Sequence, residues 1–347
     1  MGQDIRKRIE IYDKALSSKD LKQPFPKSML LEVSNICNHT CAFCANSKSD
    51  RKKGFIEKKF AMQILSEAYK LGTREVGFYA TGEPLTDKNL ETYISYAKEI
   101  GFEYVYITTN GALFDSQRIH SIIEAGIDSI KFSINGANRE DYLLIHGKDD
   151  FDKVIENLKY LSELRHAHKY KLYISFIMTR QTVATKEKFE HEYGKYVDDI
   201  VFLNCINQSG YMHELNELLA IDDAAGGYNI DGICPMVFNK LHVTYDGYLT
   251  MCCADFQNYL AIADLKKESL QEAWNNQYAQ KLRKCHLNHK LEGTICANCI
   301  YNHREPCYPL VKEYANLFDM SDYDKSAEIE ERIMTWKQKE NVAVNGE

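Results

Sequence analysis

The chain has 347 residues, of which 44% are hydrophobic and 27% charged, enough for about two domains of ~150 residues. Its 43 lysine and arginine residues against 50 aspartate and glutamate give a formal net charge of -7, so no broad basic surface for nucleic acid is expected. No apolar run reaches the ~20 residues that a membrane helix needs. The first residues alternate charged and apolar types without a signal-peptide core, so we expect a cytoplasmic protein.

The 11 cysteines are the unusual feature of this composition. In a reducing compartment they are better explained as metal ligands or reactive thiols than as disulfides. Their positions along the chain therefore guide the search for a functional site.

Short apolar runs alternate with longer helical patterns from residue 28 to residue 206. Stretches such as 59–72 place apolar residues at three- and four-residue steps, as helices do. The alternation predicts parallel strands joined by right-handed crossovers, so the fold class is α/β, with an open sheet or incomplete barrel. Ligands of such folds bind at the carboxyl ends of the strands. The predicted strands are 29–35, 74–80, 102–110, 127–135, 171–179 and 198–206.

The alternation stops near residue 215, and seven of the 11 cysteines lie between residues 234 and 307. The segment 243–251 predicts a hairpin that turns at Asp246 and Gly247. From residue 318 the charged sequence favours a capping helix or a solvated tail. We therefore divide the chain into an N-terminal helical extension (1–27), a barrel (28–215), a small cysteine-rich domain (216–315) and a C-terminal helical tail (316–347).

Three cysteines follow the first predicted strand directly, at the mouth of the predicted sheet. They are Cys37, Cys41 and Cys44. Three thiolates at this spacing can hold three irons of a [4Fe–4S] cluster and leave the fourth iron open to another ligand. A zinc site is the alternative, with His39 as a possible fourth ligand.

This CxxxCxxC spacing, with Phe43 before the third cysteine, resembles the signature of the radical S-adenosylmethionine (SAM) superfamily. The resemblance covers residues 28 to 206 and implies a partial (β/α)6 TIM-like barrel. After the second predicted strand, a TGEP segment resembles the family's GGEP motif, with threonine at its first position. The resemblance implies that this loop holds the amino group of SAM through Thr81, Gly82, Glu83 and Pro84.

Three further positions are similar to the family's SAM-binding positions. Asn110 ends the third predicted strand, and Ser133 and Asn135 end the fourth. The resemblance implies contacts to SAM at these ends, while ordinary turn chemistry is the alternative. In the segment that follows, His146 stands where a common family form has arginine.

The C-terminal cysteines can build a second metal site. Cys234 and Cys252 flank the predicted hairpin, and a CxxC lies further on. Four such thiolates suit a second cube or a structural zinc ion. After a radical SAM barrel, the arrangement resembles the SPASM/twitch extension, which carries auxiliary iron–sulfur clusters. We expect one auxiliary [4Fe–4S] cluster, held by Cys234, Cys252, Cys296 and Cys299. A second auxiliary cluster would be one ligand short, with Cys253, Cys285 and Cys307.

Two other thiols are candidate hydrogen-atom donors. Cys205 ends the sixth predicted strand, and radical SAM epimerases use such a thiol to return a hydrogen atom to the substrate radical. A small buried hydrophobic residue is the alternative reading of Cys205. Cys253 is the other candidate donor, or a core residue.

The resemblance implies an enzyme that reductively cleaves SAM to a 5′-deoxyadenosyl radical and removes a hydrogen atom from its substrate. We expect a small polar substrate of the sugar, aminocyclitol or nucleotide-sugar type, an oxidation (dehydrogenation) or epimerisation, and an electron donor of the flavodoxin or ferredoxin type. A peptide-modifying enzyme that forms thioethers, crosslinks, epimers or oxidised residues is the first alternative. It is disfavoured because only about 27 residues precede the barrel. The second alternative is a non-catalytic, zinc-stabilised binding protein.

Overall fold

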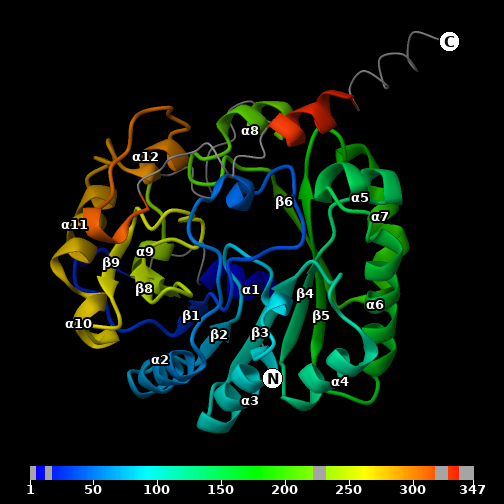
Figure 1. Cartoon of the computed structure of the whole chain (residues 1–347), viewed down its shortest axis with the longest axis horizontal. Coiled ribbons are helices and arrows are strands. Elements are labelled where there is room, and N and C mark those ends of the chain that lie inside the picture. The colour runs from blue at the N-terminus through cyan, green and yellow to red at the C-terminus, as the bar shows by residue number, and fades with distance from the viewer. Residues whose placement is uncertain (1–4, 12–17, 222–231, 317–326, 336–347) are drawn as a thin grey trace.

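A nine-stranded sheet forms the centre of the computed structural model, which describes residues 5–11, 18–221, 232–316 and 327–335 (Figure 1). The strand order is β6-β5-β4-β3-β2-β1-β7-β8-β9, so the sheet is open between β6 and β9. The strands are β1 (Ser28–Leu31), β2 (Glu75–Gly77), β3 (Tyr104–Thr109), β4 (Ser129–Ser133), β5 (Lys171–Met178), β6 (Asp199–Asn204), β7 (Lys240–Val243), β8 (Tyr248–Thr250) and β9 (Ala261–Asp264).

The first six strands are parallel and confirm the predicted alternation, although each is shorter than the apolar run that predicted it. The predicted hairpin is confirmed as the antiparallel pair β7–β8, which turns at Asp246 and Gly247. β7 pairs in parallel with β1. The cysteine-rich region therefore extends the sheet of the barrel.

The crossover helices lie on the outer face of the sheet (Figure 1). Helix α2 shows why they form: the Glu57 side chain caps its first turn by accepting from two backbone amides, and Phe60, Ile64, Leu65 and Ala68 form its buried face. These side chains belong to the main hydrophobic core between sheet and helices. The crossover helices are α2 (Lys58–Lys70), α3 (Leu90–Ile100), α4 (Ser116–Glu124), α5 (Arg139–His146), α6 (Phe151–Leu164) and α7 (Lys186–Tyr193).

Further helices belong to the C-terminal part of the chain. They are α8 (His213–Leu219), α9 (Met236–Asn239), α10 (Leu270–Trp274), α11 (Gln277–Leu287) and α12 (Ile295–Ile300). Short 3-10 turns complete the fold: η2 (Ala45–Lys48), η3 (Pro84–Thr86), η4 (Val183–Thr185), η5 (Gly194–Tyr196) and η6 (Lys312–Tyr314). No helix in the described ranges combines the length and the apolar character needed to cross a bilayer.

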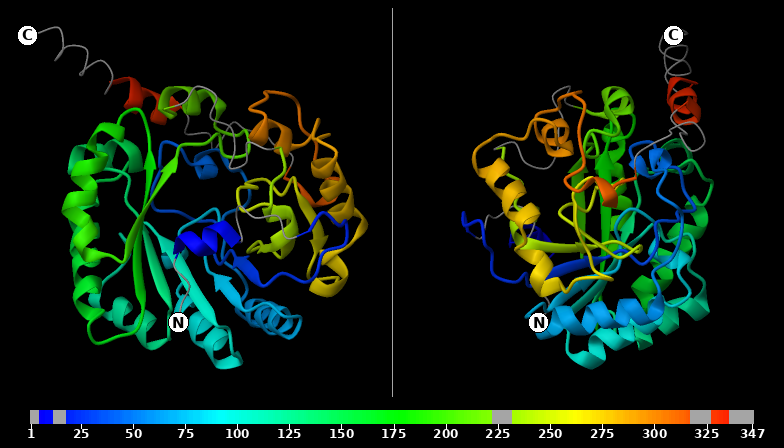
Figure 2. Two further views of the ribbon diagram at one scale, coloured as in Figure 1. Left: turned by 180° about the vertical axis from the view of Figure 1, so that it is seen from behind. Right: turned by 60° about the vertical axis from the view of Figure 1, so that its left-hand side comes forward.

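The helices over 5–9 and 327–335 contact opposite ends of the parallel strands. Helix α1 (Ile5–Ile9) lies against the first residues of β2 and β3, where Arg8 pairs with Glu75 at 2.7 Å and lies over the ring of Tyr104. A helix over 327–335, red in Figure 2, covers the loop after β1, because Ile329 and Ile333 pack into the same buried cluster as residues of that loop.

Candidate metal centres and active site

The cysteine triad of Cys37, Cys41 and Cys44 lies in the loop after β1, at the carboxyl end of the parallel strands. Burial raises the pKa of all three thiols, to about 12 for Cys37, and the charges of neighbouring thiols raise those of Cys37 and Cys41 further. Three thiolates in one buried loop repel one another unless a cation binds them. The donor set therefore suits a metal centre.

The sulfurs of the triad do not form a compact set of three ligand atoms in the described structure. Among the described residues, the set that places three ligand atoms within 4.8 Å of one another is His39, Cys41 and His146. Neither the cysteine triad nor the C-terminal cysteines form such a set. A tetrahedral zinc ion with bonds of ~2.3 Å would hold its sulfurs about 4 Å apart. A cube binds each thiolate at a different iron and accepts wider spacing.

Backbone contacts from two distant helices hold the cysteine loop. The amide of Thr40 donates to the carbonyl of His146, the last residue of α5, at 3.1 Å. Arg332, in the helix over 327–335, donates to the carbonyls of Thr40 and Leu144, both at 2.8 Å. The loop is thus fixed on the side away from β2.

The TGEP loop, residues 81–84, follows β2 directly and lies against the end of β1. The amide of Glu83 donates to the carbonyl of Ile36 at 2.8 Å. A Cβ atom at Gly82 would lie 2.5 Å from the carbonyl oxygen of Ser34, so only glycine permits this close approach. The hydroxyl of Thr81 donates to the carboxylate of Glu32. The predicted SAM loop and the cysteine loop are therefore neighbours.

The Glu83 carboxylate ties this loop to the end of β3. It accepts from the hydroxyl of Thr109 at 2.6 Å, the amide of Asn110 at 2.8 Å and the amide of Leu85 at 3.0 Å. Burial raises the pKa of Glu83, and these donors oppose the shift. A carboxylate offers about four acceptor directions, so one remains for an ammonium group. The side chain of Asn110 in turn donates to Asn38, within the cysteine loop, at 2.8 Å.

Ser133 and Asn135 lie at the same end of the sheet. The Ser133 hydroxyl is half-buried and lies 3.4 Å from that of Ser175 on β5. Asn135 is buried, and its side-chain oxygen Oδ1 accepts from the backbone amide of Ile177 at 2.7 Å. Its backbone and side-chain nitrogens both face Nε2 of His146. The side chain of Asn135 thus orients protein groups around the cysteine loop.

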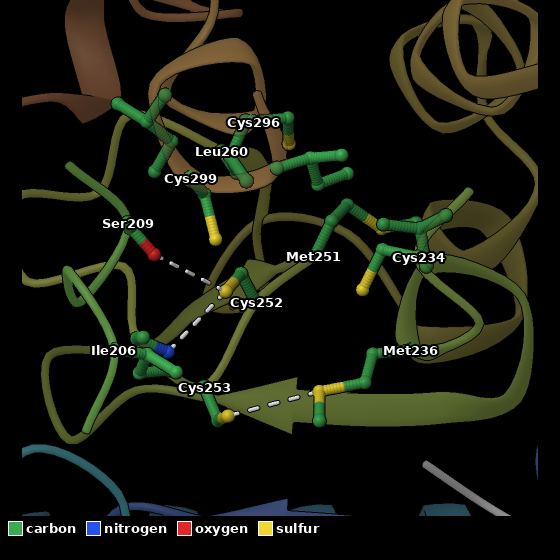
Figure 3. Close-up of a pocket in the computed structure, with 14 residues that line it drawn as sticks. Ile206, Ser209, Cys234, Met236, Met251, Cys252, Cys253, Leu260, Cys296 and Cys299 are labelled. Carbon is green, nitrogen blue, oxygen red and sulfur yellow. Dashed lines mark hydrogen bonds between the residues drawn. The ribbon is translucent and has the colours of Figure 1, made fainter. Parts of the chain in front are cut away.

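The predicted set of four C-terminal cysteines lines one cavity (Figure 3). The rest of the lining is largely apolar, with Met251 and Leu260 between the thiols. Burial raises the pKa of Cys234 to about 12, and it raises that of Cys296 as well. The structure therefore brings together Cys234, Cys252, Cys296 and Cys299, and Cys253 lines the same cavity. Cys285 and Cys307 are not among the residues that line this cavity.

Cys253 points away from the four-cysteine set, and its sulfur lies 3.8 Å from that of Met236 (Figure 3). It also lines a second, small cavity, shared with Glu32, Thr81 and His242. His242 is 3% exposed, and the partner of its ring is the neighbouring thiol of Cys253, whose pKa it lowers. Sequence reasoning missed His242, although strand alternation places it on one face of β7 with Lys240.

The side chains of Cys252 and Cys253 interact. The hydrogen bond between their sulfurs raises the pKa of Cys252 and lowers that of Cys253. Iron at Cys252 would reverse this order, because the metal keeps its ligand ionised and a second thiolate beside it is disfavoured.

Cys205 lies elsewhere. It is 2% exposed, packs in the apolar cluster that includes Phe43 and Met212, and donates to the side chain of Asn216 at 3.5 Å. Burial raises its pKa to about 12. Its position is that of a buried core residue, separate from the cavity that contains Cys253.

Family models match two parts of the chain. The model of the radical SAM superfamily matches residues 31–189, and the SPASM model, an iron–sulfur cluster-binding domain, matches residues 234–300. A probable GTP 3′,8-cyclase of Saccharolobus solfataricus is 29% identical over 133 residues, 38% of this chain and 42% of that protein. An uncharacterized protein of Methanocaldococcus jannaschii is 27% identical over 172 residues, 49% and 54% of the two chains. The chain spans about half the length of the curated relatives it matches.

Solved structures share the fold. BtrN in complex with AdoMet and 2-DOIA aligns with a TM-score of 0.54 and 21% identity, covering 84% of this chain and 98% of that one. Streptococcus suis SuiB bound to precursor peptide SuiA aligns with a TM-score of 0.61 and 17% identity, covering 84% of this chain and 76% of that one. The anSMEcpe structure with bound AdoMet aligns with a TM-score of 0.56 and 15% identity, covering 91% of this chain and 98% of that one. At these identities the likeness concerns the fold alone.

Proposed function

Because the chain belongs to the radical SAM superfamily and carries a SPASM-type iron–sulfur domain, we propose that it removes a hydrogen atom from a small polar substrate held inside the barrel. SAM and [4Fe–4S] clusters are its cofactors. We assign the first cluster to the cysteine triad, SAM to the TGEP loop (81–84), and one auxiliary cluster to the four-cysteine set. When bound, SAM and its cluster supply the chemistry that removes a hydrogen atom from a substrate C–H bond.

The cavity shared by His242 and Cys253 is the observation that carries the proposal. It adjoins Thr81 of the TGEP loop, so a polar group of a substrate that reached it would lie beside SAM. A buried polar group without its full set of partners costs about 1–3 kcal/mol, and the ring nitrogens of His242 have no polar partner besides the Cys253 thiol in the described structure. A substrate with hydroxyl or amino groups would satisfy them. This supports the sugar, aminocyclitol or nucleotide-sugar class.

Epimerisation is the reaction that we favour, with Cys253 as the hydrogen-atom donor. Once the substrate has lost a hydrogen atom, the Cys253 thiol would return one to the opposite face of the same carbon. The sulfur is then one electron and one proton short of a thiol. A reduced flavodoxin or ferredoxin would supply the electron and solvent the proton, so the substrate undergoes no net oxidation.

Dehydrogenation is a second candidate, supported by the contact between the two cavities. An alcohol that has lost a hydrogen atom becomes a carbonyl when it also loses one proton and one electron. His242 is placed to accept the proton. The electron needs an acceptor close by. The auxiliary cluster that we assign to the four-cysteine set would be one, because Cys252 lines both cavities.

Turnover in D₂O tests the proposal. Cluster-loaded protein would be incubated anaerobically with SAM, reduced flavodoxin and a panel of sugars, aminocyclitols and nucleotide sugars. Epimerisation predicts one solvent deuterium at the inverted carbon and loss of product in Cys253→Ala, while 5′-deoxyadenosine still forms. Dehydrogenation predicts a product lighter by two hydrogens, loss of product in His242→Phe and tolerance of Cys253→Ala. Cys285→Ala, outside both cavities, is the control. Modification of peptides alone would refute the substrate class.

A further inference from the structure

His146 is a buried side chain that contacts the cysteine triad and has no role in the proposed reaction. It ends α5 with 0% exposure, and its Nδ1 lies 3.5 Å from the sulfur of Cys41. The ring of Tyr142 stacks on it, with centroids 4.0 Å apart and planes at 14°. The ring therefore has one orientation, with one nitrogen aimed at a cluster ligand.

The other ring nitrogen, Nε2, faces N–H donors. The backbone amide of Asn135 lies 3.2 Å away and its side-chain nitrogen 3.1 Å away. The side-chain amide cannot be turned round, because its oxygen accepts from the amide of Ile177 at 2.7 Å. A backbone amide only donates, so Nε2 of His146 carries a lone pair. The neutral ring then has its proton on Nδ1 and donates it toward Cys41.

The same geometry excludes His146 as a metal ligand within the set of His39, Cys41 and His146. A metal at Nδ1 would need the ring proton on Nε2, and Nε2 already accepts from the backbone of Asn135. His39 is engaged differently, since its Nε2 lies 3.0 Å from the carboxylate of Asp150. The close spacing of the three residues thus reflects a hydrogen bond to sulfur.

We propose that His146 is a positioning residue that raises the reduction potential of the SAM-binding cluster by donating a hydrogen bond to the sulfur of Cys41. A reduced cluster carries one more negative charge than an oxidised one, so a donor at a ligand sulfur stabilises the reduced form more. The inference depends on the family's cluster and on the triad as its ligands. It is independent of the substrate and the reaction proposed above.

Redox titration followed by EPR tests this role in the cluster-loaded protein, without substrate. His146→Phe keeps the ring volume and the stacking on Tyr142 but removes the donor. We expect its SAM-sensitive cluster to be harder to reduce, by about tenfold in the ratio of reduced to oxidised cluster at a fixed potential, or about 59 mV for one electron. His146→Asn, whose side-chain nitrogen can occupy the Nδ1 position, should recover most of the shift.

Tyr142→Phe is the matched control. It removes a hydroxyl that has no hydrogen-bond partner in the described structure and leaves the stacked ring in place, so the potential should stay at the wild-type value. An unchanged potential in His146→Phe at equal iron content, or an equal drop in Tyr142→Phe, would overturn the proposal. If His146→Phe fails to assemble a cluster, wild-type protein labelled with ¹⁵N-histidine provides the test instead. Pulsed EPR should detect weak coupling to a histidine nitrogen, and its absence would overturn the proposal.

Discussion

Glu32→Gln should weaken the connection between the barrel and the cysteine-rich region. Glu32 follows β1, and one of its oxygens lies 2.8 Å from the guanidinium of Arg51 and accepts from the amide of Tyr245 at 3.1 Å. Arg51 also pairs with Asp246, in the turn between β7 and β8, at 2.9 Å. The other oxygen accepts from the hydroxyl of Thr81 in the TGEP loop. One carboxylate thus joins three segments.

The magnitude follows from burial. The side chains of Glu32 and Arg51 are each 1% exposed. Removing one partner of a buried ion pair costs about 3–5 kcal/mol, because the other charge stays buried. Asp246 continues to pair with Arg51, so we expect the lower end, a loss of about 3 kcal/mol in the free energy of unfolding. The total free energy of unfolding of a domain is only about 5–15 kcal/mol.

Urea unfolding of the cluster-loaded protein under anaerobic conditions measures this loss. Glu103→Gln is the control, because Glu103 is 73% exposed and lies 3.9 Å from Arg74, so its loss should cost less than about 1 kcal/mol. Combining Glu32→Gln with Arg51→Met should cost less than the sum of the single changes. A loss in Glu32→Gln no larger than in the control, or full additivity with Arg51→Met, would refute the reasoning.

Three further predictions concern the TGEP loop, the helix over 327–335 and the auxiliary site. Gly82→Ala should weaken SAM binding at least about tenfold in calorimetry, since its Cβ would displace the backbone at Ser34. Arg332→Met removes the donor to the Thr40 carbonyl and should let air bleach the clusters several-fold faster, followed by absorbance. Cys296→Ser should lower the iron content by about half while SAM still perturbs the remaining EPR signal.

Controls for these variants come from the same chain. Arg139→Met removes an exposed ion pair with Asp149 and should leave the bleaching rate unchanged. Cys285→Ser should keep the full iron content. Wild-type SAM affinity in Gly82→Ala, a wild-type bleaching rate in Arg332→Met, or undiminished iron in Cys296→Ser would contradict the corresponding assignment.

The barrel was predictable from sequence because its evidence is local. Alternating apolar runs and helical periodicity placed all six parallel strands, and Asp246 with Gly247 placed the hairpin turn. The pairing of β7 with β1 was not predicted, since Ser28 and Lys240 meet across more than 200 residues. No local pattern encodes such a contact. The extension of the sheet into the cysteine-rich region therefore emerged only from the structure.

The candidate site was likewise predictable from the sequence only in part. Cysteine spacing predicted the set of four thiols that line one cavity, because ligand type and spacing are visible in a sequence. The partners of His146 were not visible, since Cys41 lies 105 residues earlier in the chain. His242 was missed because its burial beside Cys253 is a property of packing. Glu83 was chosen by resemblance as a SAM ligand, and its contacts to Thr109 and Asn110 became known only in three dimensions.

EPR of the reduced, oxygen-free protein with and without SAM tests the central assignment most directly. In the wild type, added SAM should change the spectrum of one cluster, the one held by Cys37, Cys41 and Cys44. In the variant with all three replaced by alanine, that spectrum should be absent while the auxiliary one remains. A SAM-responsive spectrum that survives in the triple variant would contradict the account.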